Sequence, residues 1–223
     1  MEYIIRKAPV RPSLKGIWDE PAWSRAEIGR LTHFNTKSSS HRPKVEFKVA
    51  WQDDGLFVFF RAADRYVRCT RTDFQASVCK DSCCEFFVQP KPDKGYFNFE
   101  INCGGTLLLY YIEDHRRVEG GLAKRESVSA DAAGTMTIYH SMPRVVDPEI
   151  AEPVEWRIEY FIPFALFEKY VGSLGPVAGR VWRANFYKCA DESSHPHWVS
   201  WAPLDDILNF HLPGYFQPIR FET

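Results

Sequence analysis

Residues 78–103, VCKDSCCEFFVQPKPDKGYFNFEINC, decide the fold because they predict two strands joined by a turn. Apolar and polar residues alternate along FNFEINC, which is the period of a strand with one apolar face. SCCEFFVQP shows the same alternation, with Cys84, Phe86 and Val88 on its apolar side. With PKPDKG as the turn, the two segments form an antiparallel hairpin whose other side carries polar groups that a simple core does not need.

The hydrophobic pattern also sets the register of this hairpin. A shift of one residue would turn the apolar side outward, so Phe86 is expected opposite Phe99. Glu85 then faces Glu100. Like charges directly opposite each other destabilise a sheet, so this pair needs a cation, an arginine, a shared proton or a polar ligand nearby. We therefore expect a functional site around Glu85 and Glu100.

The rest of the chain is also rich in short strand patterns. VEFKVAW and LFVFFRAA flank the turn Gln52–Gly55 and predict a hairpin with a buried second strand. Helical patterns are confined to one or two turns at 22–26 and 164–170. These features predict an all-β antiparallel β-sandwich of jelly-roll or immunoglobulin-like type, with at most short helical turns. Further strands are expected at 106–112, 135–141, 155–161, 180–188 and 219–222.

Composition and charge limit the organisation and the partners of the chain. Its 223 residues are 45% apolar and 15% aromatic, enough for a substantial core, and we expect residues 1–223 to form a single domain. The 28 basic and 29 acidic residues give a net charge of −1 without long runs of either sign. Nucleic acid and membranes are therefore not expected partners, and a small neutral ligand fits better.

No segment of the sequence predicts insertion into a membrane. No apolar run approaches the ~18 residues of a spanning helix, and MEYIIRKAPVRP lacks the apolar core and cleavage site of a secretory signal. As it stands, the chain is expected to be cytoplasmic; an extracytoplasmic location would require that a signal had been removed. The six cysteines are too sparse for a disulfide scaffold, and we expect reduced thiols.

Seven motifs, in order, resemble the carbohydrate-binding module family 9 domains. The resemblance covers nearly the whole chain, and although each motif is weak alone, their shared order makes chance similarity improbable. The motifs are GIWDEPAW, VAWQDDGLFVFFRAAD, VCKDSCCEFFVQP with YFNFEINCGG, WRIEYFIPF, GRVWRANFYKC, HWVSWAPL and NFHLPGYFQPIRF.

This resemblance implies a β-sandwich that binds a carbohydrate without transforming it. Well-known members hold the end of a glucan or xylan chain between two tryptophans and are attached to polysaccharide-degrading enzymes. The implied ligand is thus a glucan- or xylan-type oligosaccharide or chain end, bound in support of polysaccharide breakdown, with a glycoside hydrolase acting alongside.

Site residues follow motif by motif. The resemblance implies that Glu85 and Asn102 contact the sugar, and that Trp201, or alternatively Trp198, forms one aromatic wall. Cys79 stands where the family has its second tryptophan. Glu100 stands where well-known sugar binders have an arginine. A site with one aromatic wall is expected to bind more weakly or differently.

The chemistry of sugar recognition agrees with this set of residues. A sugar presents apolar C–H faces and hydroxyls, which require an aromatic platform with carboxylate, amide or guanidinium partners. Arg183 and Asn185 share one face of VWRANFYKC, so Arg183 is a candidate to neutralise the glutamate pair. The competing interpretation is that all these polar residues form the solvated outer face of a sheet.

Two other function classes remain open. Two facing carboxylates are the arrangement of a glycoside hydrolase, although opposed strand residues have Cβ atoms only ~5 Å apart and leave little room for a sugar. The other class is a β-sandwich that has lost its ligand and mediates protein contacts; its support is Cys79 in place of the family's tryptophan.

Metal binding has weaker support in the sequence. His195 and His197 lie near Cys189 and Asp191, but their spacing matches no standard zinc pattern. No cofactor is predicted from the residues themselves. The resemblance leaves structural calcium open, for which Asp53–Asp54 and Asp205–Asp206 offer only fragments of an oxygen-ligand cluster.

Overall fold

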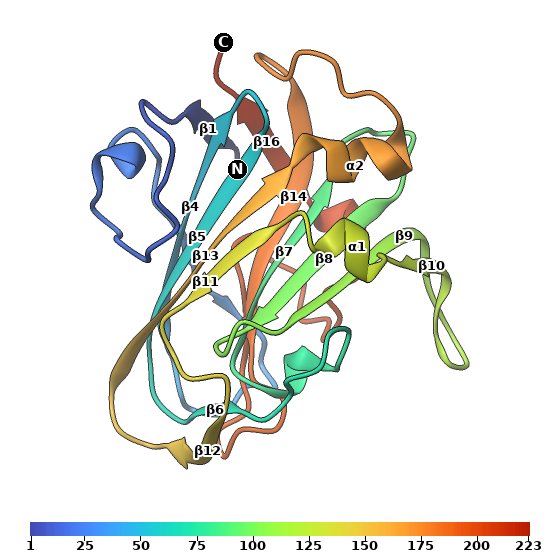
Figure 1. Ribbon diagram of the computed structural model, residues 1–223. Helices are drawn as coiled ribbons and strands as arrows, with labels where there is room; N and C mark the ends of the chain where they lie inside the picture. The colour runs from blue at the N-terminus through green and yellow to red at the C-terminus, as the bar shows by residue number, and fades with distance from the viewer.

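A computed structural model describes all residues, 1–223, and shows a nearly all-β chain with a few short helices (Figure 1). The strands are β1 (Tyr3–Lys7), β2 (Gly29–Leu31), β3 (His33–Phe34), β4 (Lys44–Gln52), β5 (Gly55–Asp64), β6 (Val67–Cys69), β7 (Cys83–Gln89), β8 (Tyr96–Asn102), β9 (Leu107–Val118), β10 (Gly121–Ser127), β11 (Thr137–His140), β12 (Val146–Ile150), β13 (Val154–Pro163), β14 (Val181–Cys189), β15 (Trp198–Ser200) and β16 (Gln217–Phe221). The helices are α1 (Ala130–Ala133) and α2 (Phe164–Val171), with 3-10 turns at Pro21–Trp23, Val78–Lys80 and Pro213–Tyr215.

The hairpin that the sequence predicts is formed by β7 and β8 in the expected register. Phe86 lies opposite Phe99, and Glu85 lies opposite Glu100. Phe86 and Phe99 are fully buried in the main core, as the apolar side of the pattern requires. The β4–β5 hairpin is confirmed as well, with Gln52 paired to Gly55 across a two-residue turn.

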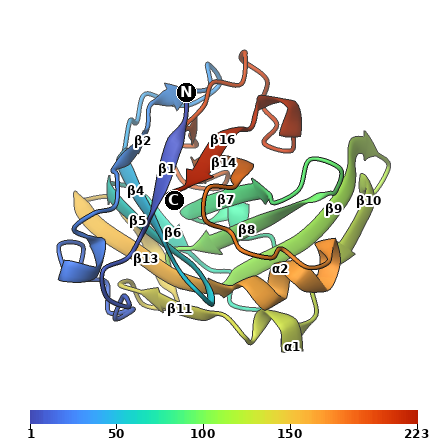
Figure 2. The same cartoon turned by 90° about the horizontal axis from the view of Figure 1, so that it is seen from above.

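The strands form two layers that share β1. One layer runs β10-β9-β8-β7-β14-β16 and the other β4-β5-β13-β11, and Figure 2 shows them facing each other across the core. β1 pairs in parallel with β16 on one side and with β4 on the other. The sheet is therefore mixed. A purely antiparallel sheet with jelly-roll or immunoglobulin-like connectivity is not confirmed, because β1 joins the layers in parallel.

Most of the expected elements are present, and the missed ones share a reason. The five further strand predictions correspond to β9, β11, β13, β14 and β16, and the two helical predictions to α2 and the turn at Pro21–Trp23. The strands without a sequence prediction are short or polar. β10, GLAKRES, has six partly or fully exposed residues and little apolar alternation.

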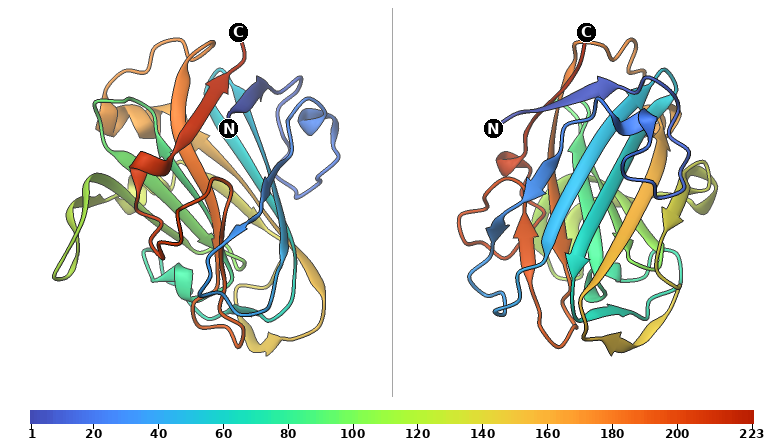
Figure 3. Two further views of the ribbon diagram at one scale, coloured as in Figure 1. Left: turned by 180° about the vertical axis from the view of Figure 1, so that it is seen from behind. Right: turned by 90° about the vertical axis from the view of Figure 1, so that its left-hand side faces the viewer.

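The outer face of the β7-β8-β14 layer is covered and not solvated. The segment 203–216, the red coil in the left panel of Figure 3, crosses this face. Leu204 and Phe216 pack there against Phe87, Tyr96 and Tyr187 in a second hydrophobic cluster. Glu85, Asn98 and Glu100 are consequently buried, so the solvated-face interpretation does not hold for them, whereas Arg183 on β14 is exposed.

Two further observations concern the whole chain. All six cysteines are free thiols, as expected. No helix combines the length and the apolar character that crossing a membrane requires.

Candidate functional site

A cleft of about 300 Å³ opens above the predicted carboxylate pair. Its floor comes from β7, β8 and β14, and its sides come from the Val78–Lys80 turn, the end of β9 and the 208–211 segment. The cleft is lined by Cys79, Glu85, Phe87, Glu100, Arg117, Cys189, Asp191, Trp198, Leu208, Asn209, Phe210 and His211. Of the residues predicted from the sequence, Glu85, Glu100, Cys79 and Trp198 therefore meet in one place.

The glutamate pair is the most buried polar group of the cleft. Glu85 is 2% exposed and Glu100 6%. The Cys189 thiol donates to Glu85 Oε1 over 3.0 Å, and Asn98 Nδ2 donates to Glu100 Oε1 over 2.8 Å. Burial, followed by the charge of Glu100, raises the pKa of Glu85 well above its ordinary value. Burial raises the pKa of Glu100 to about 7. Both shifts favour a proton on the pair near neutral pH, which is one of the four alternatives that the sequence left open.

This proton makes stability depend on pH. A carboxyl with a raised pKa binds protons more tightly in the folded state, so its contribution is complete below the unfolded pKa and is lost as pH rises through the folded one. Between about pH 5 and pH 8 the contribution of Glu100 alone should lower the unfolding free energy by roughly 2–3 kcal/mol, and Glu85 adds to this decrease. Thermal unfolding across this range measures it.

Two variants separate the pair from other carboxyls. The double variant Glu85→Gln with Glu100→Gln should flatten the pH slope, because burial raises the pKa of both carboxyls, whereas Glu113→Gln, an exposed residue on β9, should leave it unchanged. An equally steep slope in the double variant would show that the pair does not store this proton.

Trp198 supplies the aromatic side of the cleft. It is half-buried at the start of β15, and its Nε1 donates to the exposed Asp191 Oδ1 over 2.7 Å, which fixes the plane of the indole. Trp198 and Phe210 also line a neighbouring cavity of about 550 Å³. Phe210 stacks on Tyr187 with ring centroids 4.1 Å apart. Trp198 and Phe210 therefore line both the cleft and the neighbouring cavity.

Arg117 also lines the cleft and was not predicted; it brings a positive charge to the cleft but forms no ion pair with Glu85 or Glu100. It is an exposed residue near the end of β9, and its Nη2 donates to Asn209 Oδ1 over 3.1 Å. Its positive charge counteracts the rise in the pKa of Glu100. The adjacent pair Arg116–Arg117 could have indicated a cation near the site. The strand was predicted to end at residue 112, however, five residues before Arg117.

Two predicted site residues serve the core instead. Trp201 is 5% exposed and packs edge-on against Phe47 and Phe186, so it forms no wall of the cleft. Asn102 is fully buried. Its Nδ2 donates to Asp81 Oδ2 over 2.9 Å, and its Oδ1 accepts from the Thr106 amide over 2.9 Å. Through these hydrogen bonds Asn102 stabilises the turn after β8.

The two candidates on β14 also lie outside the cleft. Tyr187, and not Arg183, is opposite Glu85, since Arg183 pairs with Gln89 four residues further along β7. The Arg183 guanidinium donates to the carbonyl of Phe216. Asn185 is fully buried, and its Oδ1 accepts from the Ala202 amide over 3.0 Å. Periodicity assigned both residues to the correct face, but it could not give their position along the strand.

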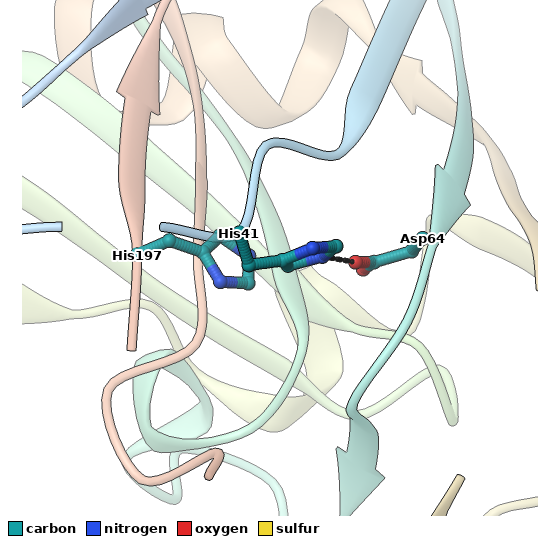
Figure 4. Close-up of side chains that lie close together, drawn as sticks. All are labelled: His41, Asp64 and His197. Atoms are coloured by element: carbon teal, nitrogen blue, oxygen red, sulfur yellow. Dashed lines mark hydrogen bonds and ion pairs between the residues drawn. The ribbon is translucent and has the colours of Figure 1, made fainter. Parts of the chain in front are cut away.

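A second buried polar cluster lies between the two layers. It is near the end of β14, on the face of this strand that points away from the cleft. His41 Nε2 is 2.7 Å from Asp64 Oδ1, and His197 lies beside them (Figure 4). Lys188 Nζ is 3.0 Å from Asp64 Oδ2 and also donates to His197 Nε2. Although burial opposes the ionised form of Asp64, Lys188 and His41 outweigh it and lower its pKa. Because an ammonium group already occupies the cation position, this cluster is not a candidate metal centre.

The aspartates considered for calcium do not fit the ion. Asp53 and Asp54 form ion pairs with Lys7 and Arg11, 2.6 and 2.8 Å away. Asp206 accepts from Thr36 Oγ1 over 2.5 Å, and Asp205 accepts from the Tyr215 hydroxyl over 2.9 Å. Calcium needs six to eight oxygen ligands around one point, and neither pair of aspartates gathers them.

Comparisons with known proteins agree with the motifs. A family model described as Carbohydrate-binding family 9 matches residues 22–221. A crystal structure of a Bacteroides uniformis protein proposed to bind carbohydrate is 27% identical, covers 99% of each chain and has a TM-score of 0.82. A family 9 module from Caldicellulosiruptor kristjanssonii in complex with cellotriose is 15% identical, with 100% and 94% coverage and a TM-score of 0.62. Its complex with glucose is 14% identical, with 98% and 95% coverage and a TM-score of 0.56. No curated protein matches the chain.

Proposed function

The chain belongs to carbohydrate-binding family 9, and from this premise we propose that it binds a carbohydrate in the cleft between Trp198 and the Glu85–Glu100 pair. The observation that carries this location is the meeting of a half-buried indole, a buried carboxyl pair and a guanidinium in one cleft of about 300 Å³. No chemical transformation of the ligand is part of the proposal.

Each group has a defined task in binding. The indole face of Trp198 stacks on the apolar C–H face of a sugar ring. The protonated carboxyl of Glu85 donates a hydrogen bond and Glu100 accepts one, so the pair matches a hydroxyl, which is both donor and acceptor. Arg117 donates from the rim of the cleft. Asp191 holds the indole in place, and Phe210 takes the role of the missing second aromatic wall.

The ligand we propose is a glucan- or xylan-type oligosaccharide or chain end. Relatives bound to cellotriose and to glucose support a sugar of this class. The neighbouring 550 Å³ cavity, which shares Trp198 and Phe210 with the cleft, gives a second sugar ring room beside the first. Binding should be modest, because stacking and a few hydrogen bonds must offset the loss of water from a hydrated ligand.

The biological setting we propose follows from the family. A module that binds such chains without cleaving them supports polysaccharide breakdown, and the partner is a glycoside hydrolase acting on the same polymer. Residues 1–223 form a single domain in this proposal.

The alternative functions have less support. Glu85 and Glu100 come from adjacent strands of one cleft wall, so they do not flank a bound sugar as the carboxylates of a glycosidase do. A degenerate module for protein contacts would need the cleft to be filled by side chains, and it is open.

Calorimetry with glucose, xylose, cellobiose and xylobiose tests the proposal. The wild-type chain should bind at least one of them saturably. Arg117→Ala should weaken binding about fivefold, which corresponds to the loss of one solvent-exposed hydrogen bond of about 1 kcal/mol. Arg116→Ala is the matched control, because Arg116 is equally exposed but pairs with Asp114. No heat with any sugar from a folded chain would favour the protein-contact alternative.

A further inference from the structure

Three side chains with metal-binding atoms converge beneath the cleft. Cys83 on β7 lies directly opposite Cys189 on β14, and Glu85 is two residues from Cys83, on the same face of its strand. The two sulfur atoms and a carboxylate oxygen all lie within 4.8 Å of one another. Cys189 and Glu85 already touch, with 3.0 Å between Sγ and Oε1.

This spacing suits one tetrahedral ion. With metal–sulfur bonds of about 2.3 Å and metal–oxygen bonds of about 2.0–2.2 Å, the ligand atoms of a zinc site lie roughly 3–4 Å apart. The separations in the structure, none above 4.8 Å, are within about 1–2 Å of these values. Two thiolates with one carboxylate favour zinc, whereas calcium and magnesium prefer oxygen ligands alone.

The position of the cluster also leaves a coordination site free. Glu85 and Cys189 both line the cleft, while Cys83 lies behind them. An ion held between Glu85 and Cys189 would therefore lie next to the cleft, from which a water molecule would complete the tetrahedron. In the Asp64 cluster the ammonium group of Lys188 contacts the carboxylate. By contrast, no ammonium or guanidinium group forms a hydrogen bond with Cys83, Cys189 or Glu85.

We propose that the reduced chain binds one Zn²⁺ ion through Cys83 Sγ, Cys189 Sγ and a Glu85 carboxylate oxygen. Each thiol and the Glu85 carboxyl lose their protons to solvent on binding, and no electron is transferred. Because the ligands must be deprotonated to bind the ion, affinity should increase with pH. The ion adds positive charge close to the Glu85–Glu100 pair, beside that of Arg117.

Cobalt(II) titration of the reduced chain under anaerobic conditions tests the site. One equivalent of Co²⁺ should give the thiolate-to-cobalt charge-transfer absorption in the near ultraviolet, and Zn²⁺ should abolish this absorption by displacement. Cys83→Ser and Cys189→Ser should each weaken Co²⁺ binding at least about 100-fold, beyond what outer-shell substitutions cause. Cys84→Ser is the matched control, since Cys84 is adjacent to Cys83 but points into the main core.

The results separate this site from sugar binding. Cys83 does not line the cleft, so Cys83→Ser should lose the cobalt signal and, with sugar titrations done in metal-free buffer, keep the sugar affinity of the wild type. Glu85→Gln, which preserves side-chain volume, should also weaken cobalt binding. Absence of the absorption in the folded wild-type chain, or its persistence in Cys83→Ser and Cys189→Ser, would overturn the proposal, whatever the sugar titrations show.

Discussion

Trp198→Ala should reduce the affinity for the preferred sugar at least about 30-fold, the loss of about 2 kcal/mol that marks a binding hot spot. The indole is the largest aromatic surface of the cleft, and the Asp191 hydrogen bond holds it in one orientation before the ligand arrives. Removing it takes away both the stacking area and this preorganisation. Isothermal titration calorimetry with the sugar identified in the panel measures the effect.

Trp198→Phe is the control for this prediction. A phenyl ring keeps an aromatic face but cannot donate to Asp191, so an intermediate loss of affinity is expected. Stability should change little in either variant, because Trp198 is half-buried at the edge of its cluster. Unchanged affinity in Trp198→Ala would mean that the ligand binds elsewhere on the molecule.

The fold could be predicted from the sequence where apolar and polar residues alternate regularly along a strand. In β7 and β8, every second residue is apolar and the wrong register would expose Phe86 and Phe99, so the sequence determined both pairing and register. β1 could not be placed in the same way. YIIRK has too few residues to show a period, and its parallel partners, β4 and β16, are distant in sequence.

The candidate site was predictable only in part, for a related reason. Alternation assigned Glu85 and Glu100 to one face, and the structure encloses that face with segment 203–216. Alternation carries no information about which loop covers a face, so Arg117 and Phe210 were missed. The choice between Trp198 and Trp201 was equally open, because only the packing of Trp201 against Phe47 shows which indole is in the core.

Lys188→Met should lower the free energy of unfolding by about 3–5 kcal/mol, the cost of leaving a buried charge without its partner. Lys188 has no exposed surface and Asp64 is 3% exposed, so water cannot replace the lost ammonium group. Asp64 would retain the hydrogen bonds from His41 Nε2 and Trp156 Nε1, at 2.7 and 3.1 Å, but not the charge that stabilises its ionised form. Urea denaturation near neutral pH measures the change.

A double variant distinguishes this mechanism from a simple packing defect. In Asp64→Asn with Lys188→Met, the uncompensated carboxylate is gone while the shape of residue 64 is retained, so the double variant should be more stable than Lys188→Met alone. Poor packing of methionine would instead leave the two variants equally unstable, or the double variant weaker still. Because His41, Asp64 and Lys188 join segments from both layers, recovery in the double variant would show that charge balance at this cluster holds the layers together.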